Sequence, residues 1–299
     1  LSGHIAALRA RAANPDEPAD AQLAAILLAL MAREDVLSAQ PQRWLGAGGT
    51  PTTDAEYAGE LTLSPSQFER ALACPLRWFL TTIGADGPSN AAASLGTLIH
   101  AVAEEHPHGT PEELTEALEA RIEELGYNLD TWAGRVADRH ARDIVNNLAS
   151  YLEGIPGPVE VEQTVSAQVE GVTIRGRMDR LEYVDEGVRV TDLKTGKSGY
   201  SAKTVPDNPQ LAAYQMALLA SGERVAGARI ALLGGDKPKY FDQPRLEGQA
   251  LEDWHDKIRS VAVDARGPYF EARPSDTACL FCPFDRLCPA RERGHKVVE

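Results

Sequence analysis

The spacing of apolar residues along the chain changes once, near residue 159. Upstream, leucine, alanine and phenylalanine recur every three to four residues, which is the period of an amphipathic helix. Downstream, Val159, Val161, Val165 and Val169 recur at even spacings, which is the period of a strand. The chain is therefore expected to begin with helices and to continue into a sheet.

The second part of the pattern predicts the elements of a mixed sheet. Gly171 and residues 185–187 supply turns between strands, and Asn208 with Pro209 begins a helix. The expected elements are strands at 159–169, 172–181, 188–193 and 228–233 and helices at 210–220 and 248–265. Helices before, between and after the strands place the chain in the α/β class, with helices on the faces of a mixed sheet.

The helical part contains a clear helix start. Ser64 is placed to cap the helix, Pro65 to occupy its first turn and Gln67 to complete a capping box. Cys74 and Pro75 fall inside the same stretch, so we expect a kink there. Further helices are expected at 94–105 and 111–153, after two in residues 1–45 that are interrupted at 14–18.

The glycine-rich residues 46–51 are typical of a linker and divide the chain. We expect residues 1–58 to form a helical lead-in and linker from a preceding domain, and residues 59–299 to form the main domain. Because the sequence begins with Leu1 and not with methionine, we expect it to be a piece of a longer polypeptide.

Composition and charge narrow the functional classes. The 299 residues carry a formal net charge of -14, which argues against a free-standing, non-specific nucleic-acid binder because phosphate neutralisation requires basic surface. No signal peptide or membrane span is visible, since the most apolar run, 23–32, is far shorter than the ~20 residues of a spanning helix. Four cysteines, three of them crowded near the end, favour a metal site in a cytosolic protein.

Candidate chemistry concentrates on two neighbouring strands. Asp192 and Lys194 are two residues apart, so both side chains project from the same face of their strand. Asp179 lies on the preceding strand of the expected hairpin and brings a second carboxylate to the same place. Two adjacent carboxylates repel unless a proton or a cation lies between them. A hard divalent ion with a lysine beside it is the simplest interpretation.

Taken singly, each candidate also has a purely structural interpretation. The acids would form ion pairs worth little stability, Asp179 with Arg177 or Arg180 and Asp192 with Lys194. A lone histidine on an apolar helix face is usually buried, and a glutamine and a tyrosine one turn apart usually mark packing. The residues of this second kind are His100, Gln210 and Tyr214. The functional interpretation therefore depends on their joint occurrence.

Four short motifs carry a family resemblance. They lie at residues 96–100 (GTLIH), 176–180 (GRMDR), 192–194 (DLK) and 210–214 (QLAAY). In this order they resemble the RecB-type nuclease domains of the PD-(D/E)XK superfamily, over roughly residues 61–299. The resemblance implies a restriction-endonuclease-like fold and the hydrolysis of DNA phosphodiester bonds.

The resemblance also implies roles for single residues. His100, Asp179 and Asp192 would be metal ligands together with the backbone carbonyl of Leu193, and Lys194 would be the catalytic lysine. The residues that would bind or orient the DNA backbone near the scissile phosphate are Gln210 and Tyr214. A histidine with carboxylates suits Mg²⁺ or Mn²⁺, and the imidazole favours Mn²⁺.

The cysteines form a second candidate site. Cys279, Cys282 and Cys288 lie in one short run, and Cys74 lies far upstream. Four thiolates hold either a [4Fe–4S] cluster or a tetrahedral zinc ion. Zinc sites more often use two short-spaced pairs, so we favour the cluster, with zinc as the alternative. The spacing resembles that of iron–sulfur nucleases in the same superfamily, which implies a structural staple and not a redox catalyst.

The resemblance implies a biological context as well. It is strongest to the C-terminal nuclease of AddB-like and Adn-type bacterial helicase–nucleases, which implies a cytoplasmic deoxyribonuclease, an exonuclease sooner than an endonuclease, in double-strand-break processing and recombinational repair. The expected partners are a DNA single strand delivered by a helicase domain of the same polypeptide, and a partner subunit. The alternatives are a free-standing CRISPR-associated RecB-like exonuclease and a non-catalytic DNA- or partner-binding module on the same fold.

Overall fold

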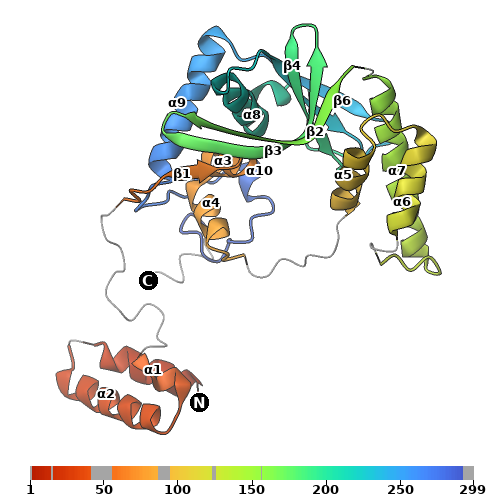
Figure 1. Cartoon of the computed structure of the whole chain (residues 1–299). Helices are drawn as coiled ribbons and strands as arrows, with labels where there is room; N and C mark the ends of the chain where they lie inside the picture. Colours follow the sequence, from red (N-terminus) through yellow and green to blue (C-terminus); the bar gives the residue numbers. More distant parts are fainter. Residues whose placement is uncertain are drawn as a thin grey trace. The chain divides into compact units, whose positions relative to one another are not determined.

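The computed structural model describes residues 2–14, 16–41, 56–86, 95–122, 126–155 and 157–291 (Figure 1). The chain forms two compact units, Leu1–Ala55 and Glu56–Glu299. The sequence pattern predicts this division after residue 58, and the linker expected at 46–51 lies outside the described residues.

The first unit is a small helical hairpin. Its elements are α1 (Ser2–Ala12), α2 (Pro18–Arg33) and a short 3₁₀ helix, η1 (Leu37–Ala39). Ile5, Leu28 and Ala39 are buried and form its core. The two helices expected in this part of the chain are both present.

The second unit contains the sheet and the remaining helices. Its strands are β1 (Leu61–Leu63), β2 (Val159–Val169), β3 (Val172–Val184), β4 (Gly187–Lys194), β5 (Val225–Leu232) and β6 (Lys239–Pro244). Its helices are α3 (Pro65–Ala73), α4 (Pro75–Thr82), α5 (Leu95–Glu105), α6 (Pro111–Arg121), α7 (Trp132–Glu153), the 3₁₀ helix η4 (Val205–Asp207), α8 (Pro209–Ala220), α9 (Gly248–Asp264) and α10 (Asp276–Cys279). Among the described residues no helix is both long enough and apolar enough to cross a lipid bilayer.

The sheet is mixed, and β3 has three partners. The order is β1-β3-β4-β5-β6, and β2 pairs with β3 along its length. β1 runs parallel to the first residues of β3, whereas β4 runs antiparallel to the last ones, from Arg180 to Val184. Between these two pairings one edge of β3 has no strand beside it among the described residues. The candidate acids lie at this gap.

Two apolar cores hold the sheet between layers of helices. On one side the sheet residues pack with α3, α8 and α9, and on the other side they pack with α5, α6 and α7 (Figure 1). The alternation along β4 shows this division, because Val190 belongs to the first core and Leu193 to the second. The prediction of an α/β fold with a mixed sheet flanked by helices is confirmed.

Local signals in the sequence specify several element boundaries. The Ser64 hydroxyl accepts the Gln67 N–H and the Gln67 side chain accepts the Ser64 N–H, which confirms the predicted capping box. At Cys74 the structure differs from the predicted kink, because the helix ends at Ala73 and a new one begins at Pro75. The short strands β1 and β6 were not predicted.

Burial of the α7 face makes a direct prediction about stability. Ile144 is fully buried between α7 and the sheet, whereas Ile83, at the end of α4, is 59% exposed. We expect Ile144→Ala to lower the free energy of unfolding by about 2–5 kcal/mol, because it removes apolar contacts and leaves a cavity. The same change at Ile83 is expected to shift it by no more than about 0.5 kcal/mol. Denaturant unfolding of the two variants measures the difference, and equal losses would contradict this packing.

Candidate functional site

The candidate site forms where β3 and β4 separate. The last paired residues of the two strands are Arg180 and Thr191, so Asp179 lies just beyond the ladder. There the Asp179 carboxylate replaces a backbone acceptor and takes a hydrogen bond of 2.7 Å from the Leu193 N–H. This bond fixes the carboxylate between the two strands, beside Asp192, which lies on β4.

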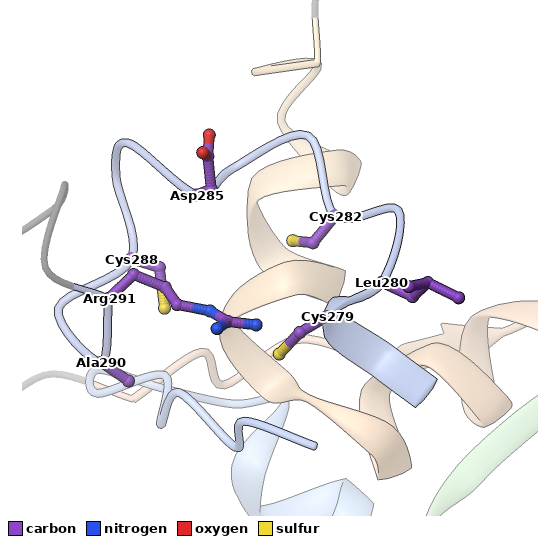
Figure 2. A pocket seen from close by; sticks show the side chains of 7 residues that line it. All are labelled: Cys279, Leu280, Cys282, Asp285, Cys288, Ala290 and Arg291. Carbon is purple, nitrogen blue, oxygen red and sulfur yellow. The ribbon is translucent and has the colours of Figure 1, made fainter. Parts of the chain in front are cut away.

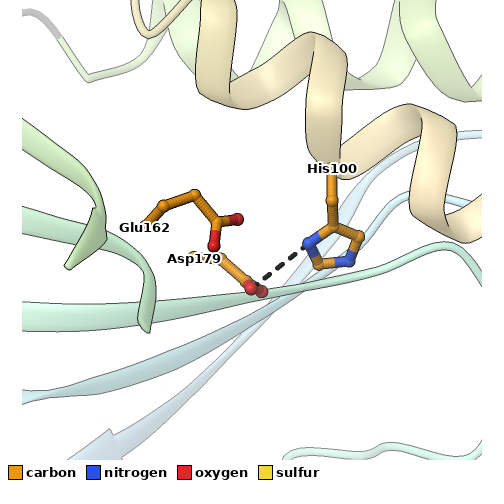
Figure 3. Close-up of side chains that lie close together, drawn as sticks. All are labelled: His100, Glu162 and Asp179. Atoms are coloured by element: carbon orange, nitrogen blue, oxygen red, sulfur yellow. Dashed lines mark ion pairs between the residues drawn. The ribbon is translucent and has the colours of Figure 1, made fainter. Parts of the chain in front are cut away.

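A histidine and a second acid meet Asp179 from neighbouring elements. His100, on α5, has its Nδ1 atom 3.2 Å from Asp179 Oδ1. Glu162, on β2, points toward the same carboxylate (Figure 3). One ligand atom of each of the three side chains lies within 4.8 Å of the others. In the described part of the chain, this is the one group of three or more His, Cys, Asp or Glu side chains that is so close.

Glu162 was not among the residues predicted from the sequence. The β2–β3 hairpin turns at Glu170 and Gly171, both with positive φ, and Val169 pairs with Val172. Counting back from this two-residue turn places Glu162 opposite Asp179, between the pairs on either side. Because directly opposed residues lie on the same face of a sheet, the register of the hairpin brings the two carboxylates together.

The predicted pair on β4 is joined by Gln210 from α8. The Lys194 Nζ atom lies 2.8 Å from Asp192 Oδ2. Gln210 donates to Asp192 Oδ1 at 2.8 Å and accepts from Lys194 Nζ at 3.3 Å. Asn208 caps the helix by accepting the Leu211 N–H, as the sequence predicts, and thereby holds Gln210 in the first turn. Asp192, Lys194 and Gln210 therefore form one hydrogen-bonded group.

The pKa values of the site residues are shifted because several carboxylates lie close together and are partly buried. The pKa of Asp192 is raised to about 6, because burial, together with the nearby Asp179 charge, outweighs the lowering effect of Lys194. The hydrogen bond with Asp179 raises the pKa of His100 against the effect of burial. Burial lowers the pKa of Lys194, but Asp192 outweighs this and leaves it raised. Negative charge in excess is what a bound cation would relieve.

The pocket over these ligands has mixed charge. It is lined by Gly96, Thr97, His100, Ala101, Glu104, Glu162, Arg177 and Asp179. Arg177 forms an ion pair with Glu162 through its Nε atom, and its side chain is 66% exposed. The pocket therefore offers carboxylates and an imidazole to a cation, and an exposed guanidinium to an anion beside it.

Tyr214 lies nearby but faces the backbone. It is 6% exposed, and its hydroxyl donates to the carbonyl of Arg177 at 2.7 Å. Arg177 lies on the stretch of β3 where one edge has no neighbouring strand among the described residues, so Tyr214 satisfies a backbone acceptor that the sheet leaves open. Its observed partner is thus the strand that carries Asp179.

Three of the four cysteines line one surface cavity. Cys279, Cys282 and Cys288 surround it, with their sulfur atoms directed inward, and Arg291 reaches across it (Figure 2). Cys74, at the break between α3 and α4, contacts the segment that leads into this loop. Its sulfur lies 4.0 Å from the Glu271 carbonyl oxygen and 3.5 Å from the Arg273 nitrogen. The sulfurs are not gathered at the distances that ligands of a single ion require.

The donor set near Asp179 fits a divalent cation. Carboxylate oxygens and an imidazole nitrogen are ligands for Mg²⁺ and Mn²⁺. The carboxylates come from β2, β3 and β4, and the imidazole comes from a helix packed on the same sheet. The packing of the strands and of α5 therefore fixes the carboxylates and the imidazole in place before a cation binds.

Comparisons with known proteins find a family and several similar proteins. Gene 69 protein of Mycobacterium phage D29 is 25% identical over 267 residues, which cover 76% of this chain and 96% of the relative. Among solved structures, SSO0001 is 17% identical with a TM-score of 0.41, covering 78% of this chain and 88% of that one. A candidate exonuclease from Eubacterium rectale is 11% identical with a TM-score of 0.45, covering 78% and 94%. The model of the PD-(D/E)XK nuclease superfamily matches residues 62–289, and the chain belongs to that superfamily.

Proposed function

We propose that this protein is a metal-dependent deoxyribonuclease. The observation that carries the proposal is that His100, Glu162 and Asp179 line one pocket, in a chain that belongs to a nuclease superfamily. Asp192 and Lys194 form an ion pair on the neighbouring strand β4. An imidazole, three carboxylates and an amine are the groups that phosphodiester hydrolysis needs for binding a cation and for stabilising charge on phosphate.

The acids and the histidine would hold the cation. His100, Glu162 and Asp179 already lie close enough together to bind one ion. Asp192 and the Leu193 carbonyl, both on β4, would complete the coordination of that ion. A bound Mg²⁺ or Mn²⁺ would lower the pKa of a coordinated water toward about 7 and would place positive charge near the phosphate. Glu162 is thus added to the ligands predicted from the sequence.

Lys194 would act on the phosphate. Asp192 keeps the pKa of Lys194 raised, so the Lys194 amine carries a proton. The protonated amine is able to stabilise negative charge that builds in the transition state. Gln210 fixes the direction of both side chains and would also orient the attacking water or the phosphate. Tyr214 supports the site by anchoring β3 at Arg177.

The biological setting is proposed from the sequence resemblance. We place the domain in an AddB-like or Adn-type helicase–nuclease of the bacterial cytoplasm, where it trims DNA ends, as an exonuclease, during double-strand-break repair. A helicase motor and a partner subunit that deliver a single strand would explain how a chain with a net charge of -14 acts on DNA.

For the cysteines we propose a structural [4Fe–4S] cluster. Cys279, Cys282 and Cys288 already face one cavity, and the Cys74 segment packs beside their loop. A tetrahedral zinc with Zn–S bonds of about 2.3 Å holds its sulfurs about 3.8 Å apart, whereas a cluster spaces its four thiolates more widely. Cysteines 74 and 288 would then close a long loop around the nuclease core.

Ligation by Glu162 is tested by metal titration. We expect Glu162→Gln to weaken Mn²⁺ binding at least about tenfold, because it removes a charged donor from the ligand group. The matched control is Glu104→Gln, since Glu104 lines the same pocket outside that group and its loss is expected to change affinity about twofold at most. Calorimetric titration measures both. Equal weakening would show that Glu162 contributes only charge.

Catalysis is tested on labelled DNA with Mg²⁺ or Mn²⁺. We expect the chain to cleave single-stranded DNA, Asp192→Ala to abolish cleavage, and Lys194→Ala to lower kcat by about 10²–10³ while it retains Mn²⁺ binding. Lys197→Ala, an exposed lysine three residues on, is expected to behave as the wild type. No cleavage of single- or double-stranded DNA by the wild-type chain would instead support a non-catalytic module.

The cluster is tested by elemental analysis of protein purified without oxygen. We expect about four irons and four sulfides per chain, with no zinc. Cys282→Ala is expected to lose both and to lower stability by a few kcal/mol, because the long loop is no longer closed. Phe281→Ala, which changes an 83% exposed neighbour, is expected to keep them. Zinc in place of iron, or unchanged stability of Cys282→Ala, would refute the structural cluster.

A further inference from the structure

The long β2–β3 hairpin exposes a polar face that the proposed chemistry has not used. Over 165–169 and 172–178, every second residue is buried or half-buried, and the residues between them are half-buried or exposed. On the outer side, the register pairs Arg177 with Thr164, Arg175 with Ser166 and Thr173 with Gln168. We call these six residues the hairpin face.

The opposite side of the hairpin is apolar and firmly packed. Val172, Ile174 and Met178 on β3 and Val165 and Val169 on β2 are buried in the core with α3, α8 and α9. Because successive side chains point to opposite sides of a strand, this packing fixes the orientation of the hairpin face. The face is therefore a rigid surface and not a mobile loop.

The hairpin face leads to the metal pocket. Its far end lies at the turn, where Glu170 pairs with His255 and Arg259 of α9. From there the strands run across the sheet toward α5, which carries His100 (Figure 1). Arg177 is two residues before Asp179 and lines the pocket itself. The face and the pocket are thus continuous.

The charge of the hairpin face is opposite to that of the chain. Its two charged residues are arginines, and its other four carry hydroxyl or amide groups. Arg175 is exposed and forms no ion pair with any described residue. Arg177 is largely exposed although it contacts Glu162. In a chain with a net charge of -14, this is a local basic track that ends at the proposed cation site.

We propose that the hairpin face binds the phosphodiester backbone of a DNA single strand and directs it into the metal pocket. The inference rests on the proposed function. Arg175 and Arg177 would pair with successive phosphates, and the hydroxyl and amide groups of the face would donate hydrogen bonds to the phosphate oxygens between them. Such contacts read no bases, so binding along this face is independent of sequence.

The test is the salt dependence of DNA binding in the cleavage-deficient Lys194→Ala chain. The probe is a labelled single-stranded oligodeoxythymidine, titrated at salt concentrations from about 50 to 200 mM. We expect Arg175→Gln to weaken binding several-fold and to reduce the logarithmic salt slope by about 0.7, the share of one phosphate contact on a single strand. The matched control is Arg224→Gln, an exposed arginine beside the opposite end of β4.

The outcomes separate a failure of the hairpin-face proposal from a failure of the proposed nuclease function. With Lys194 intact, we expect Arg175→Gln to raise KM for the single strand and to leave kcat unchanged, since the residue lies outside the pocket. Melting curves equal to that of the parent chain would show that the variant is folded. If Arg175→Gln binds the oligonucleotide with the same affinity and the same salt slope as Arg224→Gln, the hairpin face does not bind the DNA strand. This conclusion holds whether or not the chain cleaves DNA. If the wild-type chain cleaves no DNA, the proposed function fails as well.

Discussion

The structure depends on the crowding of carboxylates where β3 and β4 part. Glu162, Asp179 and Asp192 come from three neighbouring strands, and their mutual repulsion is offset by single cationic or N–H groups placed beside each. Arg177 contacts Glu162, and Lys194 contacts Asp192. Asp179 is contacted by His100 and by the Leu193 N–H. Burial, more than the Asp179 charge, raises the pKa of Asp192, and a divalent cation would stabilise the charged form of this carboxylate.

The rest of the fold holds that strained arrangement in place. The two apolar cores fix the sheet from both sides, so the three strands do not separate to relieve the repulsion. α5 brings His100 from one layer, and the capped first turn of α8 brings Gln210 from the other. Tyr214 satisfies the open edge of β3 beside the site. The helices thus place His100, Gln210 and Tyr214 beside the acids of the sheet.

The parts of this arrangement that depend on local spacing could be predicted from the sequence. The two-residue separation of Asp192 and Lys194, the cap of the helix that carries Gln210 and the capping box at Ser64 all appear in the structure as predicted. Glu162 was missed because its position beside Asp179 depends on the register of a hairpin, although the turn at 170–171 contains that information. β1 and β6 were missed because short strands are defined by their neighbours and carry little pattern of their own.

The central claim is that one cation is shared by the helix and the three strands. It is tested most directly by anomalous diffraction from crystals of the chain grown with Mn²⁺. The account predicts a manganese peak bounded by His100, Glu162, Asp179 and Asp192, with Lys194 beside it but not bound. A manganese ion elsewhere in a chain that cleaves DNA, or these side chains unchanged with no ion among them, would contradict it.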